Sequence, residues 1–123
     1  MTDIFTLEPS PKPSKIIPLE ADSLREVMQA LKTHNLVAWI ERQNTGAAKV
    51  GGRFIKFGWR GCSDLLGQLK DGRLLAVECK RPKGGKLSSD QLNFLEMVRN
   101  NGGVAFVATN LHDVIDNLGT DNQ

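Results

Sequence analysis

Apolar residues in the first third of the chain recur three and four residues apart, a spacing typical of an amphipathic helix. The recurring positions are Leu24, Val27, Met28 and Leu31. The pattern begins at Leu19 and fades near residues 34–35. An apolar run over residues 36–40 follows and predicts a strand.

The middle of the chain alternates short apolar runs with turn signals. Residues 53–57 alternate charged and apolar side chains, as in a half-buried strand. We expect a loop before it, bracketed by Asn-Thr-Gly at 44–46 and Gly-Gly at 51–52. Two further apolar strands are predicted at residues 64–69 and 74–80.

The last third predicts a helix, a strand and a second helix. Residues 88–91 have the spacing of a capping box, and the helix that they open should stop at the Asn-Gly-Gly of 101–103. A strand over 104–109 follows, and Asn110 should cap a helix that runs to Leu118. The element order indicates an α/β fold, a sheet flanked by helices.

The Lys-Asp-Gly-Arg of residues 70–73 is a strong hairpin signal between two of these strands. A three-residue loop with Gly72 in the left-handed conformation would place Asp64 opposite Glu78. A two-residue loop would place Asp64 opposite Cys79 instead, and would turn it to the other face. The chemistry described below favours the first register.

With 123 residues, 40% of them hydrophobic and 24% charged, the chain fits a single globular domain. Four of its five prolines lie in residues 8–18, so we interpret 1–18 as an N-terminal arm, 19–118 as the domain and 119–123 as a tail. No apolar run is long enough for a membrane span, and no secretory signal is visible. We therefore expect a cytoplasmic protein.

The net charge of +2 hides an uneven distribution. The segment 42–86 carries 11 basic and 3 acidic residues, a net +8, whereas the remainder carries −6. Such a segment is typical of a protein with a polyanionic partner, most commonly a nucleic acid. Taken alone, a solvated basic face explains it equally well.

The cysteines and histidines do not indicate a zinc site or a disulfide. Cys62 and Cys79 have no Cys-x-x-Cys spacing, and we expect both to be buried thiols. His34 and His112 lie far apart without a further ligand at metal-binding spacing. His34, near a helix end, is expected to be a surface or capping residue.

The acids of the basic segment suggest catalytic chemistry. Glu78 and Lys80 are two residues apart on one strand, so both project from the same face, and Cys79 faces the other. In the favoured register Asp64 joins them, its Cβ about 4.5 to 5.5 Å from that of Glu78. Carboxylates this close repel each other unless a cation lies between them, and oxygen ligands select Mg²⁺ or Mn²⁺.

Such a set is equipped for phosphodiester hydrolysis. The metal would activate water and stabilise charge on the phosphoryl oxygens, and Lys80 would position the attacking water. The alternative is that Glu78 and Lys80 form only a surface ion pair on an edge strand.

These residues resemble a known family. Its motifs are matched, in order and spacing, by Arg42-x-Asn44-Thr45-Gly46, Gly58-x-x-Gly61-x-Ser63-Asp64, Glu78-x-Lys80 and Leu87-Ser88-x-x-Gln91-x-x-Phe94. Together they resemble the VRR-NUC group of the PD-(D/E)XK nuclease superfamily over about residues 19–118. Ser63 stands where the superfamily name has proline, at a position not expected to touch metal.

The resemblance implies a restriction-endonuclease-like mixed sheet and a DNA endonuclease dependent on Mg²⁺ or Mn²⁺. It also implies cleavage that leaves 5′-phosphate and 3′-hydroxyl ends. A lone domain of this kind is similar to the stand-alone bacterial and phage members, which act as homodimers on branched DNA such as four-way junctions. A twofold dimer supplies the two sites that symmetric cleavage needs.

The resemblance further implies an acid on the first helix near the metal, for which Glu20 and Glu26 compete. At 100° per residue, Glu20 lies about 40° from Leu24 on the apolar stripe and Glu26 about 160° from it, so we favour Glu20 as a metal ligand. An acid that favours the helix dipole is the other explanation for Glu20. By resemblance, Gln91 would reach the active site in addition to its capping role.

Several basic and polar residues could grip backbone phosphates around this site. They are Arg42, Asn44, Lys49, Arg53, Lys56, Arg60, Arg81, Lys83 and Lys86. Trp59 could stack on a base, although partial burial is the commoner role of such a residue.

Two other functions are compatible with the sequence. One is a catalytically degenerate nucleic-acid-binding module, against which the intact set of two acids and a lysine argues, because carboxylates repel phosphate. The other is an RNA nuclease or a replication accessory protein, which the residues do not distinguish.

Overall fold

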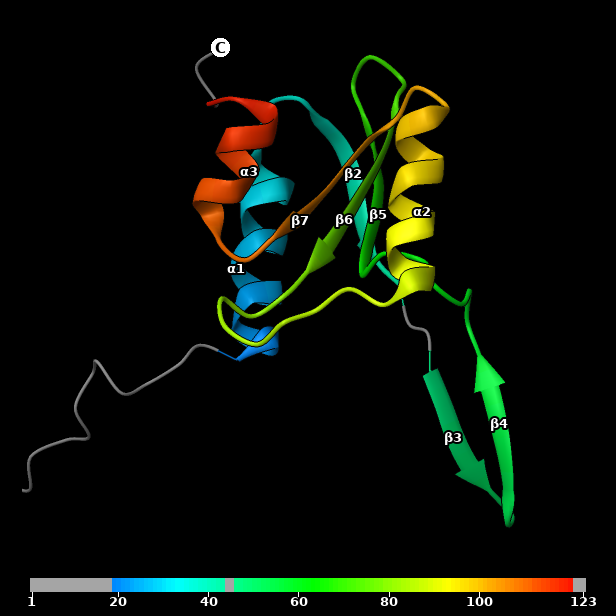
Figure 1. Ribbon diagram of the computed structural model, residues 1–123. Helices are drawn as coiled ribbons and strands as arrows, with labels where there is room; N and C mark the ends of the chain where they lie inside the picture. Colours follow the sequence, from blue (N-terminus) through cyan, green and yellow to red (C-terminus); the bar gives the residue numbers. More distant parts are fainter. Residues whose placement is uncertain (1–18, 44–45, 121–123) are drawn as a thin grey trace, which may run out of the picture.

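The computed structural model describes residues 19–43 and 46–120, and within them it has three helices and six strands. The helices are α1 (Glu20–Thr33), α2 (Ser89–Asn100) and α3 (Leu111–Leu118). The strands, labelled as in Figure 1, are β2 (Val37–Arg42), β3 (Gly46–Val50), β4 (Arg53–Phe57), β5 (Leu65–Leu69), β6 (Leu74–Cys79) and β7 (Val104–Ala108).

 The six strands form two separate sheets.

Four strands form a mixed sheet in the order β2-β5-β6-β7. β2 and β6 are antiparallel to β5, and β7 is parallel to β6. A parallel neighbour requires a crossover, which α2 supplies between β6 and β7. The predicted α/β class with a mixed sheet and flanking helices is therefore confirmed, and it is consistent with a restriction-endonuclease-like fold.

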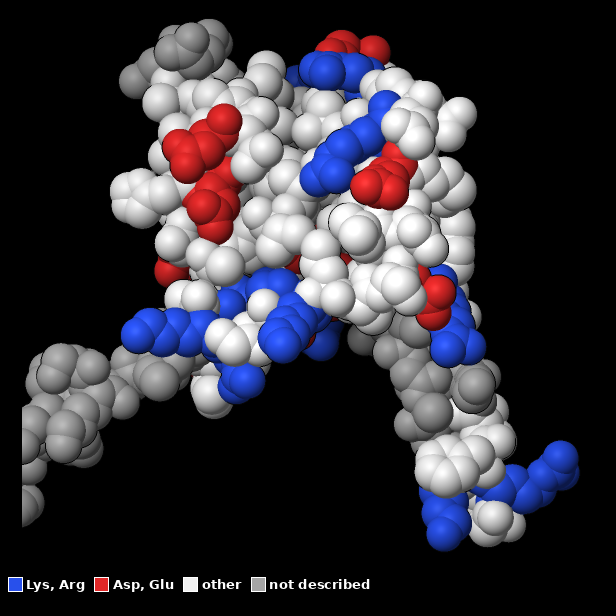
Figure 2. All heavy atoms as spheres, viewed as in Figure 1, with Lys and Arg blue, Asp and Glu red and all other residues white. Residues whose placement is uncertain are grey.

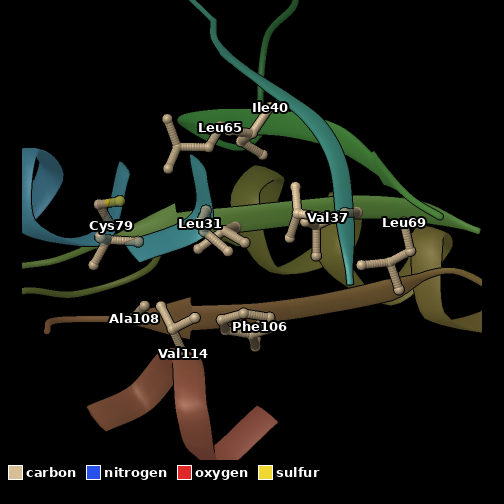
Figure 3. Packing of buried hydrophobic residues seen from close by; sticks show 12 residues of the cluster. Leu31, Val37, Ile40, Leu65, Leu69, Cys79, Phe106, Ala108 and Val114 are labelled. Carbon is tan, nitrogen blue, oxygen red and sulfur yellow. The ribbon is translucent and has the colours of Figure 1, made fainter. Parts of the chain in front are cut away.

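The sheet lies between two helical layers (Figure 1). α1 and α3 cover one face, where Val27, Leu31 and Val114 pack on buried residues of the strands. Figure 3 shows this cluster, in which Cys79 is among the buried side chains. α2 covers the other face through Phe94, Leu95 and Val98. The two faces of β6 are thus both buried.

The β5–β6 hairpin adopts the favoured register. Leu65 pairs with Val77, and Gln68 pairs with Leu74. Gly72 has a φ of 98°, and the Leu69 N–H donates to the Arg73 carbonyl at 2.9 Å. This is the three-residue loop, and its register points Asp64 toward Glu78.

One local expectation is wrong, and another is met by a residue that is more buried than a surface cap. Residues 46–50, expected in a loop, form β3, because Gly51 and Gly52 adopt positive φ values of 57° and 80° and make the turn of a hairpin with β4. His34, expected at the surface or as a cap, does occupy the C-cap of α1 but is only 5% exposed. Its ring lies 2.7 Å from the Gly119 carbonyl and accepts from the Leu36 N–H, which ties α1 to the end of α3.

The remaining helix boundaries agree with the sequence pattern. Ser88 and Gln91 form the capping box of α2, and Asn110 accepts from the Asp113 N–H at the start of α3. No helix within the described ranges has the length and apolar character needed to cross a bilayer. The arm at 1–18 and residues 121–123 of the predicted tail lie outside the described residues.

Candidate active site

The two acids of the predicted site lie at one end of the central strands, where Glu78 bonds to the backbone of Asp64 and Asp64 bonds to the backbone of Cys79. The Asp64 side chain accepts from the Cys79 N–H at 2.8 Å, and the Glu78 Oε1 accepts from the Asp64 N–H at 3.2 Å. Each carboxylate therefore fixes the strand that carries the other. The sequence reasoning missed these backbone donors, because they depend on where β5 begins relative to the end of β6.

Glu78 is held on the α2 side of the sheet, where it is 1% exposed. Its Oε2 accepts from the Gln91 Nε2 at 2.8 Å and lies 3.3 Å from the Lys80 ammonium. Lys80 is itself 13% exposed at the side chain, so the ion pair is not the surface pair of the alternative interpretation. Asp64, Glu78, Lys80 and Gln91 thus come together as one constellation.

The burial of Glu78 beside a second acid changes its protonation. Desolvation, followed by the charge of Asp64 and its hydrogen bond, raises the pKa of Glu78 to about 7, and Lys80 opposes the rise. The carboxylate pair is therefore electrostatically unfavourable when both members are ionised. A cation between them would relieve that repulsion.

Gln91 has two roles that one side chain performs together. Its Oε1 accepts from the Ser88 N–H at 2.9 Å in the capping box, and its Nε2 donates to Glu78. The first turn of α2 is therefore tied to the end of β6. The structural and the site interpretations of Gln91 both hold at the level of geometry.

The two acids of α1 lie in different surroundings. Glu20 lines a hollow of about 250 Å³ together with Arg42, Asp64 and Cys79. Glu26 instead accepts from the Leu111 N–H at 2.7 Å and caps the start of α3. The structure thus brings Glu20, and not Glu26, to the neighbourhood of Asp64.

A second hollow of about 400 Å³ lies on the α2 side, where Arg42, Asp64 and Gln91 are among its lining residues. Arg42 and Asp64 line both hollows, so Asp64 borders open space on two sides. Arg42 was predicted only as one of many phosphate contacts.

The donor set fits a magnesium-type ion. Among the described residues, no three His, Cys, Asp or Glu side chains converge into a preformed cage. Mg²⁺ does not need one, since it commonly binds through one or two carboxylates, keeps several waters and meets substrate phosphates. Asp64 and Glu78 supply that arrangement with hard oxygen donors.

The two cysteines are free and buried, as expected. Burial, together with Glu78 and Asp64, raises the pKa of the Cys62 thiol. Burial and the same acids also raise the pKa of the Cys79 thiol. Both thiols are therefore protonated at neutral pH and are poor nucleophiles or metal ligands.

The predicted phosphate contacts are distributed around the site. Arg81, Lys83 and Lys86 are exposed in the segment between β6 and α2, and Lys49 and Arg53 are exposed on the β3–β4 hairpin. Figure 2 shows Lys and Arg side chains on the lower side of the molecule and at the end of the hairpin. Asn44 and the Lys56 side chain lie outside the described residues.

Arg60 and Trp59 make protein contacts in the segment that precedes Asp64. The Arg60 guanidinium pairs with the Asp90 carboxylate at 2.9 Å, a partner that the sequence reasoning missed. The Trp59 ring packs edge-on against Phe94, with ring centroids 5.1 Å apart, and remains 56% exposed. Trp59 is therefore an exposed residue with a ring contact to Phe94, and base stacking stays a prediction.

Comparison with known protein families matched most of the chain. A family model described as the VRR-NUC domain matches residues 6–110, a range that includes every residue of the constellation. Searches of curated proteins and of solved structures gave no match.

Proposed function

Because the chain belongs to the VRR-NUC domain family, and is therefore a nuclease, we propose that it is a metal-dependent DNA endonuclease selective for branched DNA. We assign its fold to the PD-(D/E)XK superfamily and its type to the stand-alone bacterial and phage members. The preferred substrate would be a four-way junction, cleaved to leave 5′-phosphate and 3′-hydroxyl ends.

One observation carries the proposal. The carboxylates of Asp64 and Glu78 are locked to each other's strands, with the Lys80 ammonium 3.3 Å from Glu78. A pure binding module would gain nothing from two neighbouring acids that repel phosphate. Their retention inside a basic segment is explained by catalysis.

Asp64 and Glu78 would hold Mg²⁺ or Mn²⁺, with Glu20 as the further acid on the side of α1. When bound, such an ion lowers the pKa of a water molecule and stabilises negative charge on phosphoryl oxygens. Gln91 orients the Glu78 carboxylate through its Nε2 donor, so that one oxygen is fixed toward α2.

Lys80 would act on the attacking water and on developing charge. Its ammonium can donate to a water molecule beside the carboxylates, which orients the lone pair of that water toward phosphorus. The same positive charge offsets negative charge as the transition state forms. Arg42, which lines both hollows beside Asp64, would orient the phosphate.

The test is cleavage of labelled four-way junction, flap, linear duplex and single strand with Mg²⁺, Mn²⁺ or EDTA. Wild type is compared with Lys80→Ala and with Lys70→Ala, an exposed lysine in the β5–β6 turn that serves as the matched control. We expect metal-dependent cutting of the junction, a loss of at least about 100-fold in Lys80→Ala, and no loss in Lys70→Ala.

Other outcomes lead to different conclusions. Unchanged cutting by Lys80→Ala would remove this lysine from the mechanism. If the protein binds DNA but does not cleave it with either metal, the degenerate binding module is favoured. If it cleaves RNA and not DNA, the substrate is RNA.

A further inference from the structure

The β3–β4 hairpin extends away from the rest of the molecule (Figure 1). Its strands form a separate two-stranded sheet, and neither packs extensively on another described element. A two-stranded ribbon by itself is only marginally stable in water. A partner that covers the ribbon would therefore stabilise it.

The end of this hairpin is basic, and its turn consists of two glycines without side chains. Lys49 and Arg53 flank the Gly51–Gly52 turn and are exposed, and a Cβ on either glycine would meet no atom within 4 Å. Phe54, which pairs with Lys49 across the ribbon, is 77% exposed. Cations, an open turn and an exposed aromatic ring suit contact with a nucleic acid.

The charge of the segment decides between two partners. Residues 43–63 contain four basic residues and no acidic one. Two copies of the hairpin would repel each other if they paired, whereas a polyanion would be attracted. The charge therefore favours DNA over a second copy of the chain.

The base of the hairpin is fixed to α2 just before the site. Trp59 packs on Phe94, Arg60 pairs with Asp90, and a Cβ on Gly61 would lie 2.7 Å from the Asp90 carbonyl oxygen. These contacts lie between β4 and Asp64 in the chain. The segment that leads from the ribbon to Asp64 is therefore anchored on α2.

The hairpin and the segment between β6 and α2 project from the same side of the molecule (Figure 1). Figure 2 shows an open hollow between the hairpin and the body, with basic side chains on both of its sides. β6 ends and Asp64 precedes β5 at this side of the sheet. The hollow thus lies at the end of the sheet that carries the site.

Resting on the proposed nuclease function, we propose that the hairpin is a duplex-gripping arm. It enters the major groove of a double-stranded arm next to the scissile bond, with Lys49 and Arg53 on the backbone phosphates. That groove is about 12 Å wide and admits a two-stranded ribbon, and an exposed ring such as Phe54 can contact a thymine methyl group there. Five residues per strand reach about 17 Å, or about five base pairs.

The test measures how binding depends on salt. Affinities of wild type and of Lys49→Ala/Arg53→Ala are measured by fluorescence anisotropy in Ca²⁺, on a labelled 30-base-pair duplex and on a single strand of the same length. Each lost phosphate contact lowers the slope of log K against log salt by about 0.9 on duplex, so the double variant should lose about 1.8.

The matched control is Lys70→Ala/Arg73→Ala, which removes two exposed cations from the turn of the other hairpin. Its slope should equal that of wild type. The salt slope of Lys49→Ala/Arg53→Ala, the tip variant, should also differ less from that of wild type on the single strand, because a single strand has no groove. Circular dichroism checks that both variants are folded.

The inference is overturned if the slope on duplex is unchanged in the tip variant, if the control loses as much, or if duplex and single strand respond equally. Failure of the nuclease function is distinguishable, because it appears as absence of metal-dependent cutting by wild type. If cleavage depends on Lys80 but Lys49→Ala/Arg53→Ala has the salt slope of wild type, the nuclease function is supported and the role of the hairpin is refuted.

Discussion

Single residues at the site combine structural and chemical roles. Glu78 is almost completely buried, yet it bonds to a backbone N–H, to an amide and to an ammonium. Burying a carboxylate is costly unless such partners are present. Removal of any partner therefore affects both the protonation of Glu78 and the position of the strand ends.

The raised pKa of Glu78 predicts how stability of the metal-free protein depends on pH. Its pKa is about 7 in the folded chain and near 4.5 ordinarily, so the unfolded state ionises first as the pH rises. The contribution of Glu78 to the free energy of unfolding is therefore greatest below about pH 4.5. It falls by roughly 1–3 kcal/mol as the pH rises from about 4.5 to about 7. Urea unfolding in EDTA should show this fall, and Glu78→Gln should lack it; an equal fall in both would assign it to other groups.

Substitutions of Gln91 separate its two roles. Gln91→Glu keeps an acceptor for the Ser88 N–H but loses the donor to Glu78 and adds a negative charge, whereas Gln91→Ala loses both contacts. We expect Gln91→Glu to leave the thermal midpoint within a few degrees of wild type and to reduce cleavage at least about tenfold. Gln91→Ala should reduce both. Full cleavage by Gln91→Glu would restrict Gln91 to capping.

At the scale of elements, α1 distributes its acids between two tasks. Glu20 begins the helix beside the hollow that Asp64 lines, and Glu26 caps α3. The angular positions calculated for a helix separated them correctly. They did not indicate that the exposed Glu26 has a partner, because that partner, the Leu111 N–H, belongs to an element 85 residues away in the chain.

The two glutamates should respond differently to substitution. Glu26→Ala removes the acceptor for the first turn of α3 and should lower the free energy of unfolding by about 0.5–2 kcal/mol, while cleavage stays normal. Glu20→Ala should instead reduce cleavage and raise the Mg²⁺ concentration needed for half-maximal rate. Urea unfolding measures the effect of Glu26→Ala, and the cleavage rate as a function of Mg²⁺ concentration measures the effect of Glu20→Ala. Normal magnesium dependence in Glu20→Ala would leave this acid with a role at the helix dipole only.

At the scale of the whole molecule, most exposed cations of the segment 42–86 lie on the hairpin and between β6 and α2, whereas Lys70 and Arg73 lie in the β5–β6 turn. Figure 2 shows acidic side chains on the upper part of the body, away from the hairpin end. A strongly asymmetric charge directs a polyanion toward one side. One chain carries one constellation, whereas the proposed junction needs cuts at two symmetric positions.

The proposed junction cleavage therefore predicts a homodimer. Light scattering after gel filtration should give twice the 13.5 kDa chain mass, and paired cuts on opposite strands should occur within one protein–DNA encounter. Dilution below the dimer dissociation constant should reduce paired cutting more than single nicking. A monomer that still makes paired cuts would contradict the dimer.

Most of the elements and much of the constellation could be predicted from the sequence alone. Helical spacing, the capping box at Ser88 and the Gly72 turn are local patterns, so they were readable without the fold. The period of two along a strand put Glu78 and Lys80 on one face, and the choice of hairpin loop brought Asp64 to them.

Contacts between groups from distant parts of the chain could be identified only in the folded structure. The Gln91 bond to Glu78, the Arg60 pair with Asp90 and the burial of His34 each join separate elements. The projection of the β3–β4 ribbon also came from the structure, because two glycines can bracket a loop or form a tight turn. Local propensity cannot choose between these, since the choice depends on contacts that exist only when the sheet and helices are packed.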